Sequence, residues 1–374
     1  MSKKKKKKDW RGSIVLAISI LIGGFGGFYG AKTGFFDDMT GLNLIVFLAS
    51  LVLWFFLGIV IHELGHLICG KMSGYRFGFF KLGSLSWFRE DGTIKFKRSK
   101  NFAPGQCLMI PPDDEADFRF LWYNLGGGVF NLLTGLALWL LWFLLSDDHI
   151  LKHIATAGIV INVLFGVTNL IPIRSQGNDG ANIVGALKST DGKRAFYLTL
   201  YINGQLMLGK RFSEIDEERI RHYGKMDPTN HLVGNLLMYE MEYLLETDLP
   251  EEALMIATQI DTAKFPAIHA QLFKLYQLLI YTAFLPDFDK ARAIYKDKDL
   301  QAFLKLKLPS ITVILVAYEF FVNNDRAKAE KLLVQAKKDI ANLPNKGERL
   351  GLIDYLAEIE AAMQETQGHN MINN

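Results

Sequence analysis

Cysteine is scarce in this chain, which has only two cysteines in 374 residues, Cys69 and Cys107. Two thiols are too few for a disulfide scaffold or a cysteine-built zinc site, and we expect both to be reduced. The charge balance is also weak, because a formal net charge of +3 gives no argument for nucleic-acid binding. The sequence thus predicts a protein without disulfides and without a nucleic-acid partner.

Long apolar segments fill the N-terminal half of the chain. A membrane span needs ~20 mostly apolar residues, and the segments that meet this requirement are 13–31, 42–68, 120–145 and 150–173. Residues beyond 210 are charged, as in soluble proteins. We therefore expect an α-helical multi-pass membrane protein with a basic tail (1–12), a membrane domain (13–210) and an all-α soluble domain (211–374).

The first apolar segment follows six lysines, Lys3 to Lys8, as the apolar part of a signal peptide would. It is as long as a membrane span, and no clear small-residue cleavage site follows it. We expect an uncleaved transmembrane helix, with a cleaved signal peptide as the alternative. The lysine run is interpreted as a solvated tail that fixes orientation.

Basic residues alternate between the predicted loops. The N-terminal tail is basic, the loop 32–41 has one lysine, and the segment 71–119 has nine basic residues. The turn at 146–149 is acidic, and basic residues return after 173. Because lysine and arginine favour the cytoplasmic side, four spans place both termini in the cytoplasm of a cell, which we expect to be bacterial.

Two further patterns concern local structure. Aromatic and polar residues alternate over 75–100 around Asp91-Gly92, which predicts a small cytoplasmic β-hairpin. Beyond 230, three amphipathic helices precede alanine-centred segments, with Ala253, Ala291 and Ala327 at the centres. This pattern resembles tetratricopeptide-like helix pairs, whose period is ~34 residues; an irregular helical bundle is the alternative. We expect these helices to bind a substrate or a regulatory protein.

The strongest chemical signal is His62-Glu63-Leu64-Gly65-His66. Residues four apart lie on one helix face, so both imidazoles can reach one zinc ion, while Glu63 can take a proton from water. Such a motif alone occurs in many unrelated chains. Here it ends a predicted membrane span, where ionisable groups are costly and usually functional.

A catalytic zinc ion usually has three protein ligands and one open position. Asp179, which follows the fourth predicted span, is the best candidate for the third ligand. Asp91 and the acidic residues of 113–117 are rivals by charge, although they lie in predicted turns where solvated acids are common.

Three motifs over 42–187 resemble those of the site-2 protease family of intramembrane zinc metalloproteases. They are His62–His66, the segment Gly126-Gly127-Gly128-Val129-Phe130-Asn131, and Asn169-x-x-Pro172 followed by Asp179-Gly180. The resemblance implies that His62, His66 and Asp179 bind one zinc ion, that Glu63 is catalytic, and that Asn131 and Asn169 help to hold the substrate. Two departures are Gly128 in place of the family's proline and a longer interval between Asn169 and Asp179, with Asn178 where leucine is common.

The predicted reaction is hydrolysis of a peptide bond in a membrane-embedded or membrane-anchored substrate. One alternative is a membrane receptor or scaffold that works through its C-terminal helices without catalysis. A metal transporter is a second alternative, but it predicts more ionisable or thiol groups within the spans than the sequence has.

Overall fold

The computed structural model describes residues 41–90, 92–146, 150–173, 177–262, 265, 267–306 and 308–372. The expected basic tail and first span (13–31) lie outside the described residues. The chain forms two compact units. Among the described residues, the first unit contains the segment up to Leu85 and the segment Phe102–Lys188. The second unit contains Ser86–Asn101 and the residues from Ser189 onward. The helix after Ser189 thus belongs to the second unit, although we expected the boundary near 210.

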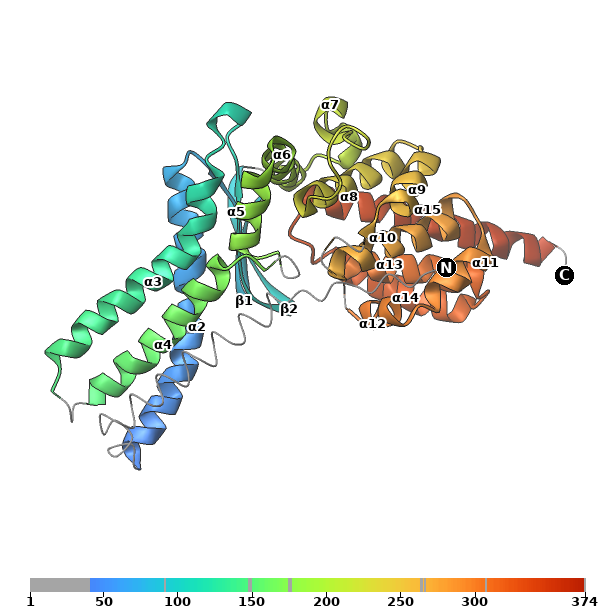
Figure 1. Ribbon diagram of the computed structural model, residues 1–374. Coiled ribbons are helices and arrows are strands. Elements are labelled where there is room, and N and C mark those ends of the chain that lie inside the picture. The colour runs from blue at the N-terminus through green and yellow to red at the C-terminus, as the bar shows by residue number, and fades with distance from the viewer. Residues whose placement is uncertain are drawn as a thin grey trace, which may run out of the picture. The chain divides into compact units, whose positions relative to one another are not determined.

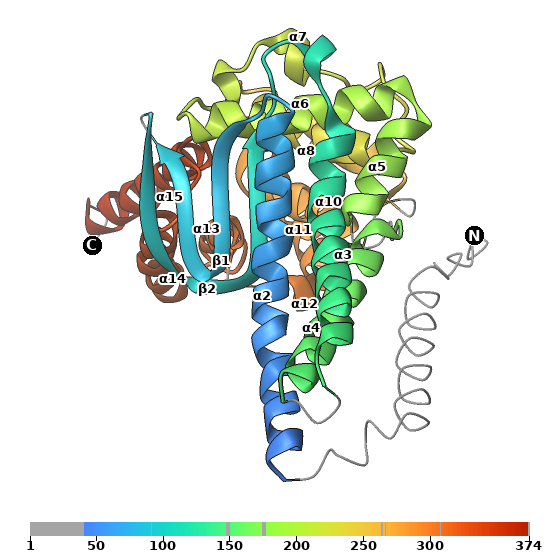
Figure 2. The ribbon, with the colours of Figure 1, turned by 90° about the vertical axis from the view of Figure 1, so that its left-hand side faces the viewer.

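Three long helices dominate the first unit: α2 (Leu42–Met72), α3 (Phe120–Leu144) and α4 (Ile150–Leu170). They pack against one another (Figures 1 and 2). All three are long and apolar enough to cross a membrane, as expected from the sequence. Large apolar side chains such as Leu53, Phe56 and Leu140 are exposed on them, which is the distribution that a lipid environment favours. Helix α4 ends two residues before Pro172, because a proline disfavours helical backbone in the residue before it.

Glycine allows α2 and α3 to approach each other closely near the HELGH motif. A Cβ atom on Gly65 would lie 2.3 Å from the carbonyl oxygen of Gly126, and one on Gly126 would lie 2.4 Å from that of Gly65. Small residues permit this backbone contact between membrane helices. The crossing brings the start of α3 over the face of α2 that carries His62 and His66.

The predicted hairpin is present and longer than expected. Strands β1 (Arg76–Glu90) and β2 (Thr93–Ile110) form a two-stranded sheet, so pairing continues past residue 100, where we expected it to end. Gly92 adopts a φ of 77° in the turn, a conformation that glycine tolerates. The base of the hairpin belongs to the first unit and its tip to the second. At the tip, Glu90 is paired with Lys95 and Arg349.

Apart from the tip of the β-hairpin, the described part of the second unit is mostly helical. After α6 (Thr190–Met207) and short helical turns at η2 (Phe212–Glu214) and α7 (Glu217–Ile220), the helices are α8 (His231–Glu246), α9 (Pro250–Gln259), α10 (Ala267–Leu279), α11 (Phe288–Tyr295), α12 (Lys298–Phe303), α13 (Pro309–Ala317), α14 (Arg326–Ile340) and α15 (Lys346–Ile372). In the pairs α8–α9, α10–α11 and α13–α14, two helices that are consecutive in the sequence pack against each other.

The buried alanines of these pairs recur every 38 residues, an interval longer than the ~34 residues of tetratricopeptide repeats. Ala253, Ala291 and Ala329 are each fully buried, and successive members are 38 residues apart. Ala327, which we expected at the third position, is exposed. The π-helical turns η4 (Ile280–Phe284) and η5 (Tyr318–Val322), which end the first helices of two pairs, keep the same interval.

Candidate metal centre

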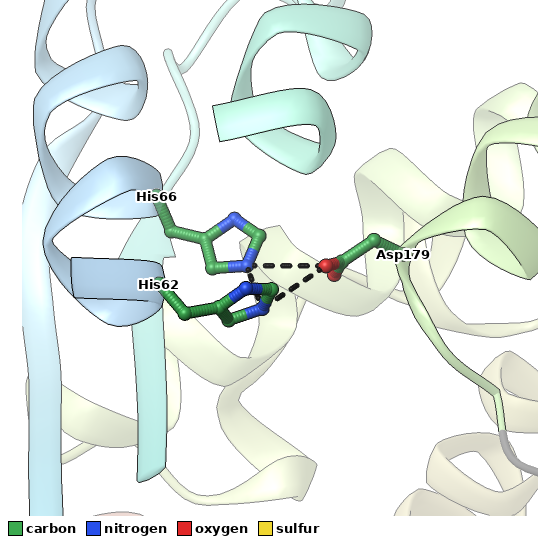
Figure 3. Close-up of side chains that lie close together, drawn as sticks. All are labelled: His62, His66 and Asp179. Carbon is green, nitrogen blue, oxygen red and sulfur yellow. Dashed lines mark hydrogen bonds and ion pairs between the residues drawn. The ribbon is translucent and has the colours of Figure 1, made fainter. Parts of the chain in front are cut away.

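Two helices bring together the side chains of His62, His66 and Asp179. The histidines are four residues apart on α2, and Asp179 is the first residue of α5 (Asp179–Lys188). Asp179 Oδ2 lies 3.2 Å from His62 Nε2 and 3.3 Å from His66 Nε2, and the two Nε2 atoms are 3.1 Å apart (Figure 3). These three atoms therefore form a nearly equilateral triangle, and the three residues could hold a metal ion.

The other ring nitrogen of each histidine faces a carbonyl oxygen. His62 Nδ1 lies 2.9 Å from Asn131 Oδ1, and His66 Nδ1 lies 2.7 Å from the backbone carbonyl of Tyr123. A carbonyl oxygen only accepts hydrogen bonds, so each Nδ1 carries the proton and donates it. In the neutral imidazole this leaves Nε2 as a lone-pair donor, and such bonds are typical of metal-ligating histidines.

A cation would resolve the electrostatics of the triangle. Three lone-pair atoms face one another within 3.3 Å, and Asp179 Oδ2 is buried without a hydrogen-bond partner within the described part of the chain. Without a cation or extra protons, these atoms repel each other. Ligands placed ~2.0–2.1 Å from a tetrahedral zinc ion lie about 3.3 Å from one another. The donor set and its spacing fit such an ion.

Asn131 positions His62 through a fully buried amide. Its Nδ2 donates to the carbonyl oxygen of Gly58 and to Asn162 Oδ1, both at 2.9 Å, which fixes Oδ1 toward His62. Asn162 in turn donates to the carbonyl oxygen of Gly158. Both asparagines have no exposed surface. Asn131 thus lies near the site, as expected, but its amide is used within the protein, so this geometry offers it no contact with a substrate.

Asn178 places Asp179. Its side chain accepts hydrogen bonds from the backbone N–H groups of Ile173 and Ala181, and its Nδ2 donates to the carbonyl oxygens of Thr168 and Ile171. Asparagine is a favoured residue just before a helix, and here it also joins the end of α4 to the start of α5. The next residue, Gly180, is required for close contact, because a Cβ atom there would lie 2.2 Å from the carbonyl oxygen of Leu170.

Glu63 lies beneath strand β2. A Cβ atom on Gly105 would lie 2.6 Å from Glu63 Oε1 and 2.9 Å from Glu63 Cγ. Tyr123 Oη donates to the carbonyl oxygen of Cys107 and so anchors the same stretch of strand to α3. Glu63 is only 8% exposed. A buried carboxylate next to the triangle is therefore held by the base of the hairpin.

Gly127 covers the triangle from α3. A Cβ atom at this position would lie 2.5 Å from His66 Nε2 and 2.7 Å from His62 Nε2. The glycines of 126–128 thus serve close packing, as small residues in membrane helices do. At Gly127 the closely packed neighbours are the two candidate ligands themselves.

The remaining predicted residues lie elsewhere or make other bonds. Asn169 donates to the carbonyl oxygen of Phe165 in its own helix, and no bond from its side chain reaches the triangle in the described structure. Of the rival carboxylates, Asp113 pairs with Arg76, and Asp114 caps a short 3₁₀ turn; Asp91 lies outside the described residues. Sequence reasoning missed Asn162 and Asn178 as positioning residues. An amide within a predicted span and an asparagine before a helix start were the available signals.

Comparison of the chain with family models, with curated proteins and with solved structures found no match in any of the three.

Proposed function

We propose that this protein is a zinc-dependent endopeptidase that cleaves membrane-embedded or membrane-anchored peptides. The observation that carries the proposal is the triangle of His62 Nε2, His66 Nε2 and Asp179 Oδ2, three facing lone-pair atoms 3.1–3.3 Å apart, with a buried glutamate beside them. Two histidines and one carboxylate leave an open fourth position on a tetrahedral ion, which is the arrangement of catalytic zinc sites.

Zinc is preferred over harder ions because of the donor set. Imidazole nitrogen suits zinc, copper, iron and nickel, whereas magnesium and calcium favour oxygen ligands. The spacing of about 3.3 Å that a tetrahedral ion requires agrees with the observed triangle. A bound zinc ion would supply Lewis acidity that lowers the pKa of a water molecule and polarises the scissile carbonyl.

The protein's own residues would perform the proton transfers. Glu63 would accept the proton of the attacking water and pass it to the leaving amine. The close contact with Gly105 on strand β2 restricts the position of its carboxylate. Asn131 and the Tyr123 carbonyl keep both imidazoles in the tautomer that leaves Nε2 unprotonated.

The position of the site supports a substrate at the membrane edge. Helix α2 has 31 residues and is about 46 Å long at ~1.5 Å per residue, more than the ~30 Å hydrocarbon core. His62 follows the first ~20 residues, the length that fills this core. A substrate helix must unwind there, because its carbonyls are otherwise bonded internally. The free edge of the two-stranded sheet could pair with the extended peptide.

Glu63→Gln tests the proposal. The variant should bind about one zinc ion per chain, as wild type does, while cleavage falls by several orders of magnitude. Metal content would be measured on purified protein, and uncut small membrane proteins would be sought by comparing the membrane proteomes of variant and wild-type cells. Cleavage at the wild-type rate would exclude Glu63 as the base. An unchanged proteome and no bound zinc in wild type would favour a receptor or scaffold.

A further inference from the structure

The second unit contains a cavity that the proposed protease site does not use. It has a volume of about 270 Å³ and lies among α6, α8, α10, α13 and α15. Its walls are mainly leucine, valine, isoleucine and aromatic side chains. This volume is close to the ~300 Å³ lower bound of small-ligand pockets, so it suits one long side chain or one small molecule.

Three carboxylates line this cavity, and no lysine, arginine or histidine does. Glu242 and Glu246 are four residues apart on α8, so they share one helix face, and Glu348 comes from the start of α15. Nearby Arg211 is paired with Asp354 and does not line the cavity. The lining therefore combines three carboxyl groups with no cationic side chain.

The three glutamates differ in their partners. Glu242 accepts hydrogen bonds from Tyr276 at 2.8 Å and from Tyr355 at 3.3 Å. Glu246 accepts one from the backbone N–H of Ser213. The Glu348 carboxylate has no hydrogen-bond or ion-pair partner within the described part of the chain, although burial raises its pKa. Glu348 is half-buried in the cavity wall, and a cationic ligand would give its carboxylate a charge-assisted hydrogen bond.

We propose that this cavity binds the ammonium or guanidinium group of a lysine or arginine side chain in a peptide segment. The apolar walls fit the aliphatic stem, and the glutamates would receive the charged head. Stacked helix pairs commonly present such concave peptide-binding surfaces. If the C-terminal region is cytoplasmic, as the basic loops predict, membrane proteins supply the required residues, because their cytoplasmic flanks are rich in lysine and arginine.

The binding test uses the full-length protein in lipid nanodiscs. The probe is the peptide acetyl-Gly-Leu-Lys-Leu-Gly-amide, compared by calorimetry with the same peptide carrying norleucine in place of lysine. We expect the lysine peptide to bind about tenfold more tightly or better, the range expected of hydrogen bonds to a charged group. Its affinity should fall with added salt. Equal affinity for the two peptides would overturn the proposal, and binding of free pentane-1,5-diamine but not of the lysine peptide would exclude a peptide ligand.

Variants test the residues independently of catalysis. Glu348→Gln and Glu242→Gln should each weaken binding of the lysine peptide about tenfold. Glu365→Gln, an exposed change on the same helix α15, should leave it unchanged. Burial raises the pKa of Glu242, and repulsion by the carboxylates of Glu246 and Glu348 raises it further. Because it removes one of these repelling groups, Glu348→Leu should raise the melting temperature of the second unit while abolishing selective binding. A lowered melting temperature in Glu348→Leu would show that Glu348 serves the fold and would overturn its role in ligand binding, whatever the state of the zinc site.

Discussion

Replacing Gly127 by alanine should damage the metal centre without changing any of its ligands. The added methyl group would lie 2.5 Å from His66 Nε2, 2.6 Å from His62 Cε1 and 2.7 Å from His62 Nε2. These separations are too short for real contacts, so one of the imidazoles or the helix must move. Either movement alters the triangle that both histidines form with Asp179.

The size of the effect follows from the cost of overpacking. Inserting a methyl group into a tightly packed site costs ~1–3 kcal/mol, and ~1.4 kcal/mol corresponds to a tenfold change in affinity. We therefore expect zinc affinity to fall by roughly 5- to 150-fold. Helix propensity acts in the opposite direction, because alanine stabilises the interior of a helix by ~1 kcal/mol relative to glycine. A loss of affinity would thus report the contact with the histidines and not a weakened helix.

The assay is competition for zinc between the purified protein and a chromogenic chelator, with thermal unfolding as a check on the fold. Gly135→Ala is the matched control, because it makes the same change on α3 where the nearest atom, Val163 Cγ2, would lie 3.2 Å away. It should keep wild-type affinity. If Gly127→Ala also binds zinc as tightly as wild type, the zinc ion does not bind between His62, His66 and Asp179, and the proposed metal centre is wrong.

Four further predictions follow from the same structure. Asp179→Ala should lower zinc affinity sharply in the chelator assay, whereas Asp113→Ala, which removes an exposed partner of Arg76, should not. Asn131→Ala should lower zinc affinity about 10- to 100-fold, because His62 loses the acceptor that fixes its tautomer. Burial raises the pKa of Glu242 from 4.5 to about 7, so native protein retains a proton that unfolded chain releases. The free energy of unfolding of wild type, relative to that of Glu242→Gln, should therefore fall by up to about 3 kcal/mol as the pH rises from 4.5 to about 7. Chemical unfolding at several pH values would measure this change. Cysteine labelling of intact cells should reach a probe near residue 147 and miss one near Lys97; the reverse would contradict cytoplasmic termini.

The parts of the fold that sequence could predict are those set by local patterns. Three helices match the expected spans because ~20 apolar residues specify a membrane helix without reference to the rest of the chain. The Asp91-Gly92 dipeptide marked the hairpin turn, since Gly92 supplies the positive φ. The length of the hairpin was not predictable in this way, because its base is held by tertiary contacts such as that of Gly105 with Glu63.

Distant contacts also decided which repeat position was the buried one. Ala327 and Ala329 follow the same helix start and have the same side chain, but only Ala329 faces the neighbouring helix. The sequence did contain a signal that separates the two alanines, because Ala329 repeats the 38-residue interval between Ala253 and Ala291 and Ala327 does not. Burial in the structure assigns the position and yields a constant interval of 38 residues.

The candidate ligands were predictable because their spacing follows from helix geometry, but the reason why Asp179 reaches the histidines was not. The interval between Asn169 and Asp179 is longer than in the family that the motifs resemble, which argued against Asp179. The structure shows that the interval alone does not determine the position. Asn178 bonds to two carbonyl oxygens at the end of α4 and to two N–H groups beyond it. This side chain connects the end of α4 to the start of α5, where Asp179 is directed at the histidines (Figure 3). The hydrogen bonds of Asn178 therefore determine the position of Asp179, and the number of residues after Asn169 does not.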